Sequence, residues 1–205
     1  MVDPTYFGYG GFSFSWGDHI CAIFEEPSQQ DEIMGGFMAQ GLRAAQRCVW
    51  VAPGRSAQHL RDSLADMRAD LPTLEASEQL LVISDVDFYL QDNLFEPDRV
   101  MALLETLLAD GQRAGYPTMR IATDLSWLRG NRIDPDLWEE FEGRQTQDLA
   151  GLPVVLVCQY DRRQLSGSIM VSAFRTHPIV IVGDAIHQNP FFVARAAGPA
   201  ISEIM

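Results

Sequence analysis

The chain has 205 residues, a mass of 22.9 kDa and a formal net charge of −13. Hydrophobic residues make up 47% of it, which is enough to form a core and excludes a globally disordered chain. A polyphosphate backbone would repel so acidic a surface, so direct nucleic-acid binding is not expected. All 15 basic residues are arginine, which excludes a phosphate-loop lysine, a Schiff base and a lysine general base.

Membrane insertion and secretion are not expected either. No stretch approaches the roughly 20 apolar residues of a membrane helix, and the first residues lack the basic and apolar regions of a signal peptide. The three cysteines, Cys21, Cys48 and Cys158, are too few and too scattered for a disulfide framework. We therefore expect a cytoplasmic protein.

The chain divides into an arm, one body and a tail. Residues 1–17 are rich in glycine and aromatic residues and lack periodicity. We expect them to form an arm that packs on the body through its rings, or alternatively a lid or a dimer arm. Residues 18–193 are predicted to form a single domain, and residues 194–205 are predicted to be a weakly ordered tail.

Within the body, short apolar runs alternate with amphipathic segments. The predicted strands are residues 19–24, 48–52, 80–84, 119–123, 153–158 and 179–182, with a turn towards 185–187. The predicted helices are residues 31–47 with Ser28 as N-cap, 56–67 with Ser56 as N-cap, 97–113, 135–149 and 164–175. Residues 85–92 are predicted to be a loop. This alternation predicts an α/β domain of three layers, a mostly parallel sheet with helices on both faces.

In such sheets, ligands bind outside the carboxyl ends of the strands. The residues expected there are acidic and aromatic, and include Glu25, Asp85, Tyr89, Asp124, Trp127 and Tyr160. The first strand-to-helix turn reads Glu25-Glu-Pro-Ser-Gln-Gln-Asp31, with neither glycine nor lysine, and no Gly-x-Gly-x-x-Gly occurs. ATP hydrolysis and dinucleotide binding are therefore disfavoured.

Histidines and cysteines offer a weaker signal. His19 and Cys21 lie two residues apart and so share one strand face, and Cys158, His177 and His187 fall on or near other strands. None shows a metal-ligand spacing, so their convergence would depend on the fold. We predict no metal and no cofactor, with buried cysteines acting as small apolar residues. A residual enzyme or a metal protein that uses these cysteines and histidines is kept as an alternative.

The helix predicted at 135–149 is acidic. Its Glu139, Glu140 and Glu142 are interpreted as a solvated face, or alternatively as a surface that docks a partner.

Several phrases of the sequence, in order, carry a family resemblance. They are Asp18-His-Ile-Cys-Ala-Ile-Phe24, Asp85-Val-Asp-Phe-Tyr89, Thr123-Asp-Leu-Ser-Trp127, Val157-Cys-Gln-Tyr-Asp-Arg-Arg163, Arg175-Thr-His-Pro178 and Asn189-Pro-Phe-Phe192. Together they resemble the MEDS domain, the sensory domain named for methanogens and methylotrophs and for the DcmR regulator. The resemblance spans nearly all of the chain after residue 17. It implies a RecA/KaiC-like α/β fold that lacks Walker motifs and senses small molecules.

The resemblance also implies site residues and partners. His19, Cys21, Asp124, Trp127, Cys158, Tyr160 and His177 fall on the family's motif positions. Phe24 stands where a tyrosine is expected, which removes a hydroxyl from the pocket. Family members are often fused to kinases or DNA-binding modules, and none is evident after Val193, so the output is expected from another chain or from a longer protein.

We therefore predict a non-enzymatic sensory domain of a signalling or transcription-control system. A small, largely apolar ligand is expected at the strand carboxyl ends, packed by Trp127, Tyr160 and Tyr89, with polar contacts from His19 and Asp124. Cys21, Phe24, Glu25, Cys158 and His177 complete the expected ligand-binding set. The alternative is a ligand-free interaction module that docks a kinase, a sigma-factor regulator or another signalling partner. A homodimer is also considered.

Overall fold

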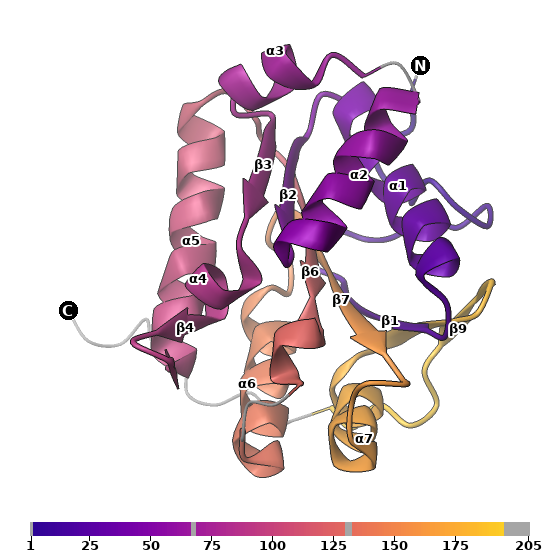
Figure 1. The fold of residues 1–205 in the computed structure, drawn as a ribbon, viewed down its shortest axis with the longest axis vertical. Coiled ribbons are helices and arrows are strands. Elements are labelled where there is room, and N and C mark those ends of the chain that lie inside the picture. Colours follow the sequence, from indigo (N-terminus) through magenta and orange to yellow (C-terminus); the bar gives the residue numbers. More distant parts are fainter. Residues whose placement is uncertain (1, 67–68, 130–132, 195–205) are drawn as a thin grey trace.

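The computed structural model of the chain describes residues 2–66, 69–129 and 133–194. A seven-stranded sheet in the order β3-β2-β6-β7-β1-β8-β9 runs through the molecule, and helices cover both of its faces (Figure 1). All its neighbouring strands are parallel except β8 and β9, which are antiparallel. The expected three-layer, mostly parallel α/β architecture is confirmed. Within the described residues, no helix is long and apolar enough to cross a membrane.

The strands of the main sheet are β1 (His19–Phe24), β2 (Arg47–Val51), β3 (Leu80–Ile83), β6 (Met119–Asp124), β7 (Val154–Asp161), β8 (Ile179–Val182) and β9 (Ala185–Gln188). A separate hairpin consists of β4 (Leu90–Gln91) and β5 (Leu94–Phe95). The helices are α1 (Pro27–Arg43), α2 (Gly54–Asp66), α3 (Leu71–Ala76), α4 (Asp85–Tyr89), α5 (Pro97–Arg113), α6 (Pro135–Asp148) and α7 (Gly167–Thr176), with a 3-10 helix, η1 (Leu125–Leu128).

Each central strand contributes to two cores because successive side chains of a strand point to opposite faces of the sheet. In β1, Cys21 and Ile23 pack against the layer that contains α5, α6 and α7, whereas Ile20 and Ala22 pack against α1 and α2. All six residues of β1 are buried. His19, two residues before Cys21, therefore points into the α5–α7 layer.

Both predicted helix caps were wrong. Helix α1 begins at Pro27 with Glu26 as its N-cap, and the Gln29 side chain accepts the backbone N–H of Glu26 at 3.2 Å. Ser56 lies inside α2, and its hydroxyl donates to Asp124 at 2.7 Å instead. Met67, the last residue of the helix predicted at 56–67, lies outside the described residues.

The loop predicted at 85–92 was also wrong, because this segment holds α4 and the start of the β4–β5 hairpin. Ser84 is the N-cap of α4, and its hydroxyl accepts the N–H of Asp87. Asp92 and Asn93 have φ values of +52° and +62°, as a two-residue type I′ hairpin turn requires. Each strand of the hairpin has only two residues, too few for an alternating pattern to be recognised.

The N-terminal arm packs on the body through its rings. Phe7 and Phe14 are buried in the α1–α2 core, and the guanidinium of Arg120 lies 4.9 Å from the centre of the Phe14 ring. Arg120, from β6, is itself fully buried, and burial lowers its pKa to about 10. Its N–H groups donate to the Gln46 side chain and to the carbonyl oxygens of Pro4, Tyr6, Phe7 and Phe37.

Replacement of Arg120 by methionine should destabilise the fold by about 3–5 kcal/mol, the range for breaking a buried charged network. The physical reason is that the carbonyl oxygens of Pro4, Tyr6, Phe7 and Phe37 would lose a charged donor. The free energy of unfolding from urea titration, followed by circular dichroism, measures this loss. Arg113→Met is the matched control, since Arg113 is exposed and forms a surface ion pair with Asp110 at the end of α5. Its effect should stay within about 0.5 kcal/mol. Equal effects of the two substitutions would contradict the role assigned to Arg120.

Candidate functional site in the α5–α7 layer

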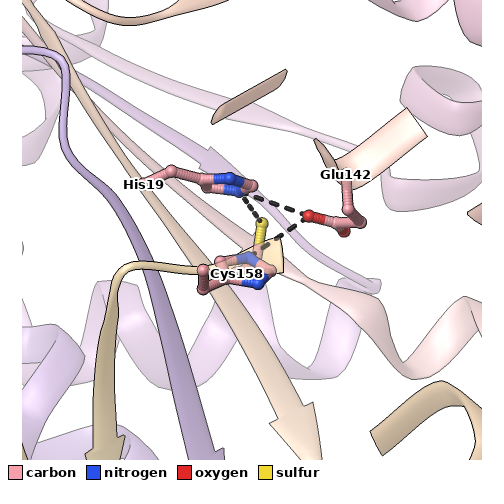
Figure 2. A group of neighbouring side chains, drawn as sticks. His19, Glu142 and Cys158 are labelled. Atoms are coloured by element: carbon pink, nitrogen blue, oxygen red, sulfur yellow. Dashed lines mark hydrogen bonds and ion pairs between the residues drawn. The ribbon is translucent and has the colours of Figure 1, made fainter. Parts of the chain in front are cut away.

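Four buried polar side chains converge beneath helix α6. His19 comes from the start of β1, Glu142 from α6, Cys158 from β7 and His177 from the connection between α7 and β8. None has any exposed surface. One ligand atom from each lies within 4.8 Å of the others, and Figure 2 shows three of these side chains pointing toward one another. We call these four residues the buried tetrad.

Strand register and helical spacing explain the convergence. Strands β1 and β7 are parallel neighbours with Cys21 opposite Cys158. His19 and Cys158 therefore lie on the same face of the sheet, offset by two residues in register. In α6, Trp138 and Glu142 are four residues apart and both are buried, which places the carboxyl group on the inner side of the helix. His177 is the C-cap of α7 and immediately precedes Pro178 and β8.

The carboxyl group of Glu142 is the centre of the tetrad. Its Oε2 lies 3.3 Å from His19 Nε2 and 3.2 Å from His177 Nε2. His19 Nε2 also lies 3.2 Å from Cys158 Sγ. The other carboxyl oxygen, Oε1, accepts the hydroxyl of Tyr160 at 3.0 Å. Glu142 thereby connects α6 to β1, to β7 and to the residue that ends α7.

The outer ring nitrogens define the tautomers of the two histidines. His177 Nδ1 lies 2.8 Å from the carbonyl oxygen of Ala173, which can only accept, so Nδ1 carries a proton. His19 Nδ1 lies 2.8 Å from Thr146 Oγ1, and this hydroxyl donates to the carbonyl oxygen of Thr176 at 2.6 Å, so it accepts from His19. When the rings are neutral, both Nε2 atoms therefore direct a lone pair into the tetrad.

Burial determines the protonation states of two tetrad groups. It lowers the pKa of His19 well below its usual value, and the neighbouring His177 adds to this effect. It raises the pKa of the Cys158 thiol well above its usual value, and the charge of Glu142 adds to this effect. At neutral pH, His19 is therefore a neutral imidazole and Cys158 a protonated thiol.

An aromatic cluster lies in the same core layer as Cys158 and Tyr160. Tyr89 stacks on Trp127 with 4.8 Å between ring centres, and Trp138 meets Trp127 edge to face at 5.8 Å. Phe95 and Phe141 complete this aromatic cluster. Tyr89 and Trp127, which were predicted to pack a ligand at the strand ends, pack against each other in the core.

A polar groove of about 330 Å³ occupies the carboxyl ends of the strands. Asp124 accepts from Ser56 at 2.7 Å and from the Gln30 side chain at 3.3 Å, and Gln30 also donates to Gln159 at 2.7 Å. Phe24 lines the groove, and Arg129, Asp161 and Arg163 add charge to it. The groove is thus bridged by hydrogen bonds between its own side chains and is not the largely apolar site that was expected.

The predicted ligand-binding residues therefore fall into three groups. His19, Cys21, Cys158, Tyr160 and His177 lie in the α5–α7 layer, and Tyr89 and Trp127 belong to the aromatic cluster beside them. Asp124 and Phe24 line the carboxyl-end groove, while Glu25 lies nearby in a surface ion pair with Arg162 at 2.7 Å. The expectation that His19 contacts a ligand at the strand carboxyl ends was wrong, because His19 begins β1 at its amino end.

Glu142 is the functional candidate that the sequence analysis missed. It was assigned to a solvated acidic face, yet it has no exposed surface. The available signal was its spacing of four residues from Trp138, which a helical periodicity places on the same face. The acidic composition of the helix hides this position, since buried glutamates are rare.

A pocket of about 310 Å³ between α6, α7 and the C-terminal segment adjoins the tetrad. We call it the α6–α7 pocket. Its lining includes Gly143, Thr146, Ala150, Thr176, Phe192 and Val193. Thr146 hydrogen-bonds to His19, and Thr176 Oγ1 lies 3.0 Å from His177 Nδ1, so two lining residues contact the tetrad directly.

Comparison with solved structures defines the class of the fold. The flagellar accessory protein FlaH from Methanocaldococcus jannaschii has a TM-score of 0.55 and 12% sequence identity, covering 86% of this chain and 77% of FlaH. The KaiC-like protein PH0186 from Pyrococcus horikoshii OT3 has a TM-score of 0.57 and 13% identity, covering 88% of this chain and 80% of PH0186. The chain thus has a RecA/KaiC-like α/β fold, as the sequence resemblance implied.

The chain belongs to the MEDS family, whose model, described as the methanogen/methylotroph DcmR sensory domain, matches residues 18–178. It is also similar to the transcriptional repressor DcmR of Methylorubrum extorquens (strain DSM 6343 / CIP 106787 / DM4), with 23% identity over 168 residues. This match covers 82% of the chain but only 60% of the length of the repressor. Membership of this family supports a sensory role in regulation.

The three thiols should resist modification in the folded protein. All are buried, and burial raises the pKa of Cys48 to about 12 and those of Cys21 and Cys158 well above their usual value. Because the thiolate is the reactive form, Ellman's reagent at pH 8 should label the native chain at least about a hundredfold more slowly than the chain in urea. Rapid labelling of one thiol without denaturant would show that this cysteine is accessible and ionised.

Proposed function

We propose that this chain is a non-enzymatic sensory domain whose sensing centre is the buried tetrad. A small, largely apolar effector enters the α6–α7 pocket and acts on the tetrad from there. The observation that carries the proposal is that Thr146 and Thr176 line the pocket and also hydrogen-bond to His19 and His177. The apolar part of the lining, with Ala150, Phe192 and Val193, suits a small organic molecule.

An effector in this pocket would be positioned to change how α6 and α7 contact each other. The helices are joined by the Thr146 hydrogen bond to the Thr176 carbonyl and by an ion pair of 3.1 Å between Arg175 and Glu139. The backbone N–H of Val193 donates to the Arg175 carbonyl, so the C-terminal segment follows α7. An effector that binds one arrangement of α6 and α7 more tightly than another increases the population of that arrangement. The C-terminal segment transmits this change to a signalling partner or a fused output module.

The absence of an enzymatic role is part of the proposal. The turn that would hold a phosphate carries Glu25 and Glu26, and the N-terminus of α1 is capped by a carboxylate residue. Such a turn repels phosphate. The groove at the strand ends uses Asp124 in hydrogen bonds to Ser56 and Gln30. These features favour sensing over nucleotide chemistry.

One observation favours the second candidate function, a ligand-free interaction module. Val171, Phe191 and Val193 are 56%, 67% and 51% exposed, and they line one apolar surface over α7 and the C-terminal segment. An exposed apolar surface of this kind suits a protein partner. In the sensory proposal, the same surface is where the signalling partner or the output module docks.

A blocking substitution tests the α6–α7 pocket. The chain is screened by thermal shift against one- to six-carbon alcohols, halides, ketones and amides. At about one hundred times its Kd, an effector contributes about 2.7 kcal/mol, which is a shift of several degrees. Ala150→Phe fills the pocket and should remove at least half of this shift. Ala102→Phe, at an exposed alanine of α5, should leave it intact.

Two results would contradict the placement of the effector. A stabilising compound that acts equally on wild type and Ala150→Phe would bind elsewhere. A compound whose effect is lost on Gln30→Ala would point to the carboxyl-end groove. A panel without any stabilising compound would favour the interaction module.

A further inference from the structure

We infer that the buried tetrad is a Zn²⁺ site in which the ligands are His19 Nε2, His177 Nε2, Cys158 Sγ and Glu142 Oε2. This inference names the chemistry of the centre proposed above and rests on that proposal only for its functional meaning. The metal itself can be measured without any effector. Three independent features of the tetrad support it: its dimensions, the direction of its lone pairs and its charge.

The spacing of the four atoms matches a small tetrahedral site. Bonds of about 2.0–2.3 Å from zinc to nitrogen, oxygen and sulfur place ligand atoms roughly 3.3–3.8 Å apart at the corners of a tetrahedron. In the tetrad, the three contacts around His19 Nε2 and Glu142 Oε2 measure 3.2, 3.3 and 3.2 Å, and all four atoms lie within 4.8 Å of one another. Three of the six separations already fit such a site, and the others, none above 4.8 Å, would need to shorten by about 1 Å at most to bind a metal.

The lone pairs of the tetrad face one another. Both Nδ1 atoms carry protons because Thr146 and Ala173 accept from them, so in the neutral rings both Nε2 atoms are acceptors. Each lies 3.2–3.3 Å from Glu142 Oε2, which is also an acceptor. Three acceptors at this distance repel one another unless a proton or a metal cation lies between them. The Nδ1 hydrogen bonds also fix both rings in the tautomer that binds a metal through Nε2.

The charge of the tetrad favours the cation over a single proton. Among the described residues, the ion-pair partners of Glu142 are the two histidines, at 3.3 and 3.2 Å. A carboxylate in this position is costly without a full positive charge. A divalent ion that displaces the thiol proton of Cys158 is balanced by one carboxylate and one thiolate, which leaves the buried group neutral. Two imidazoles, one thiolate and one carboxylate in a tetrahedral arrangement suit zinc among the available divalent metals.

Cobalt serves as the spectroscopic probe of the site. Purified protein is stripped with a chelator and titrated anaerobically with Co²⁺. We expect one equivalent to bind, with the strong visible bands of four-coordinate Co²⁺ and a near-ultraviolet thiolate-to-cobalt charge-transfer band. Zinc should displace the cobalt. Cys158→Ser should abolish the charge-transfer band and weaken Co²⁺ binding by at least about tenfold.

Cys21→Ser is the matched control because Cys21 is equally buried, lies on the same face and is the register neighbour of Cys158. It should keep the charge-transfer band. Thr146→Val removes the hydrogen bond to His19 Nδ1 together with the one to the Thr176 carbonyl, but removes no ligand atom. It should weaken Co²⁺ binding by about 10–100-fold and leave the band shape unchanged. Circular dichroism establishes that each variant is folded, and the wild-type titration stands even where a variant fails to fold.

Several results would overturn the inference. They are a folded wild-type chain that binds less than about one tenth of an equivalent of Co²⁺ or Zn²⁺, a six-coordinate cobalt spectrum, and a charge-transfer band that survives in Cys158→Ser or disappears in Cys21→Ser. Failure of this inference is separable from failure of the proposed function. A metal-free chain whose thermal shift still depends on Ala150 would retain an effector pocket without a metal.

Discussion

The carboxyl group of Glu142 is the interaction on which the arrangement of the α5–α7 layer depends. It has no exposed surface, and its two oxygens contact groups from β1, β7 and the residue that ends α7. An ionised carboxylate loses several kcal/mol of hydration on such burial, so the fold must supply its partners at fixed positions. Helix α6 cannot be displaced or rotated without separating Glu142 from those partners.

The position of these buried polar residues differs from the position at which the sheet topology predicts a ligand site. In doubly wound sheets, the edge formed by the strand carboxyl ends is where ligands bind. Here that edge is spanned by hydrogen bonds from Ser56 and Gln30 to Asp124. The buried tetrad lies instead near the amino end of β1 and beneath helix α6, with no exposed surface. In the function proposed above, a site enclosed in this way responds to changes in helix packing rather than to direct capture of a solute from solvent.

The sequence was most informative where a segment is long and its ends carry strong signals. Helix α5 was predicted with its observed bounds because Pro97 opens it and an apolar stripe runs along it. Strand β1 was also predicted with its observed bounds, because a strand that is buried on both faces has a continuous apolar run. Short elements gave too little pattern, and the hairpin at Asp92 and Asn93 was missed.

The candidate site was only partly predictable for a different physical reason. His19, Cys158 and His177 were selected by residue type and family resemblance, but the register of β1 and β7 brings the first two together. No local spacing encodes that register. Glu142 was hidden because a glutamate in an acidic helix is usually solvated, and only its position relative to Trp138 indicated otherwise.

The N-terminal arm affects how the boundary of the domain should be drawn. The family model begins at residue 18, yet three of the five acceptors that Arg120 contacts are carbonyl oxygens of the arm, those of Pro4, Tyr6 and Phe7. Gly8, with φ of +105°, brings the arm so close to α1 that a Cβ there would lie 2.2 Å from the Gly36 carbonyl oxygen. A fragment cut at the family boundary would open the α1–α2 core to water and leave a guanidinium ion in the cavity. The smallest autonomous folding unit of this chain therefore extends further toward the N-terminus than the segment that the family model matches.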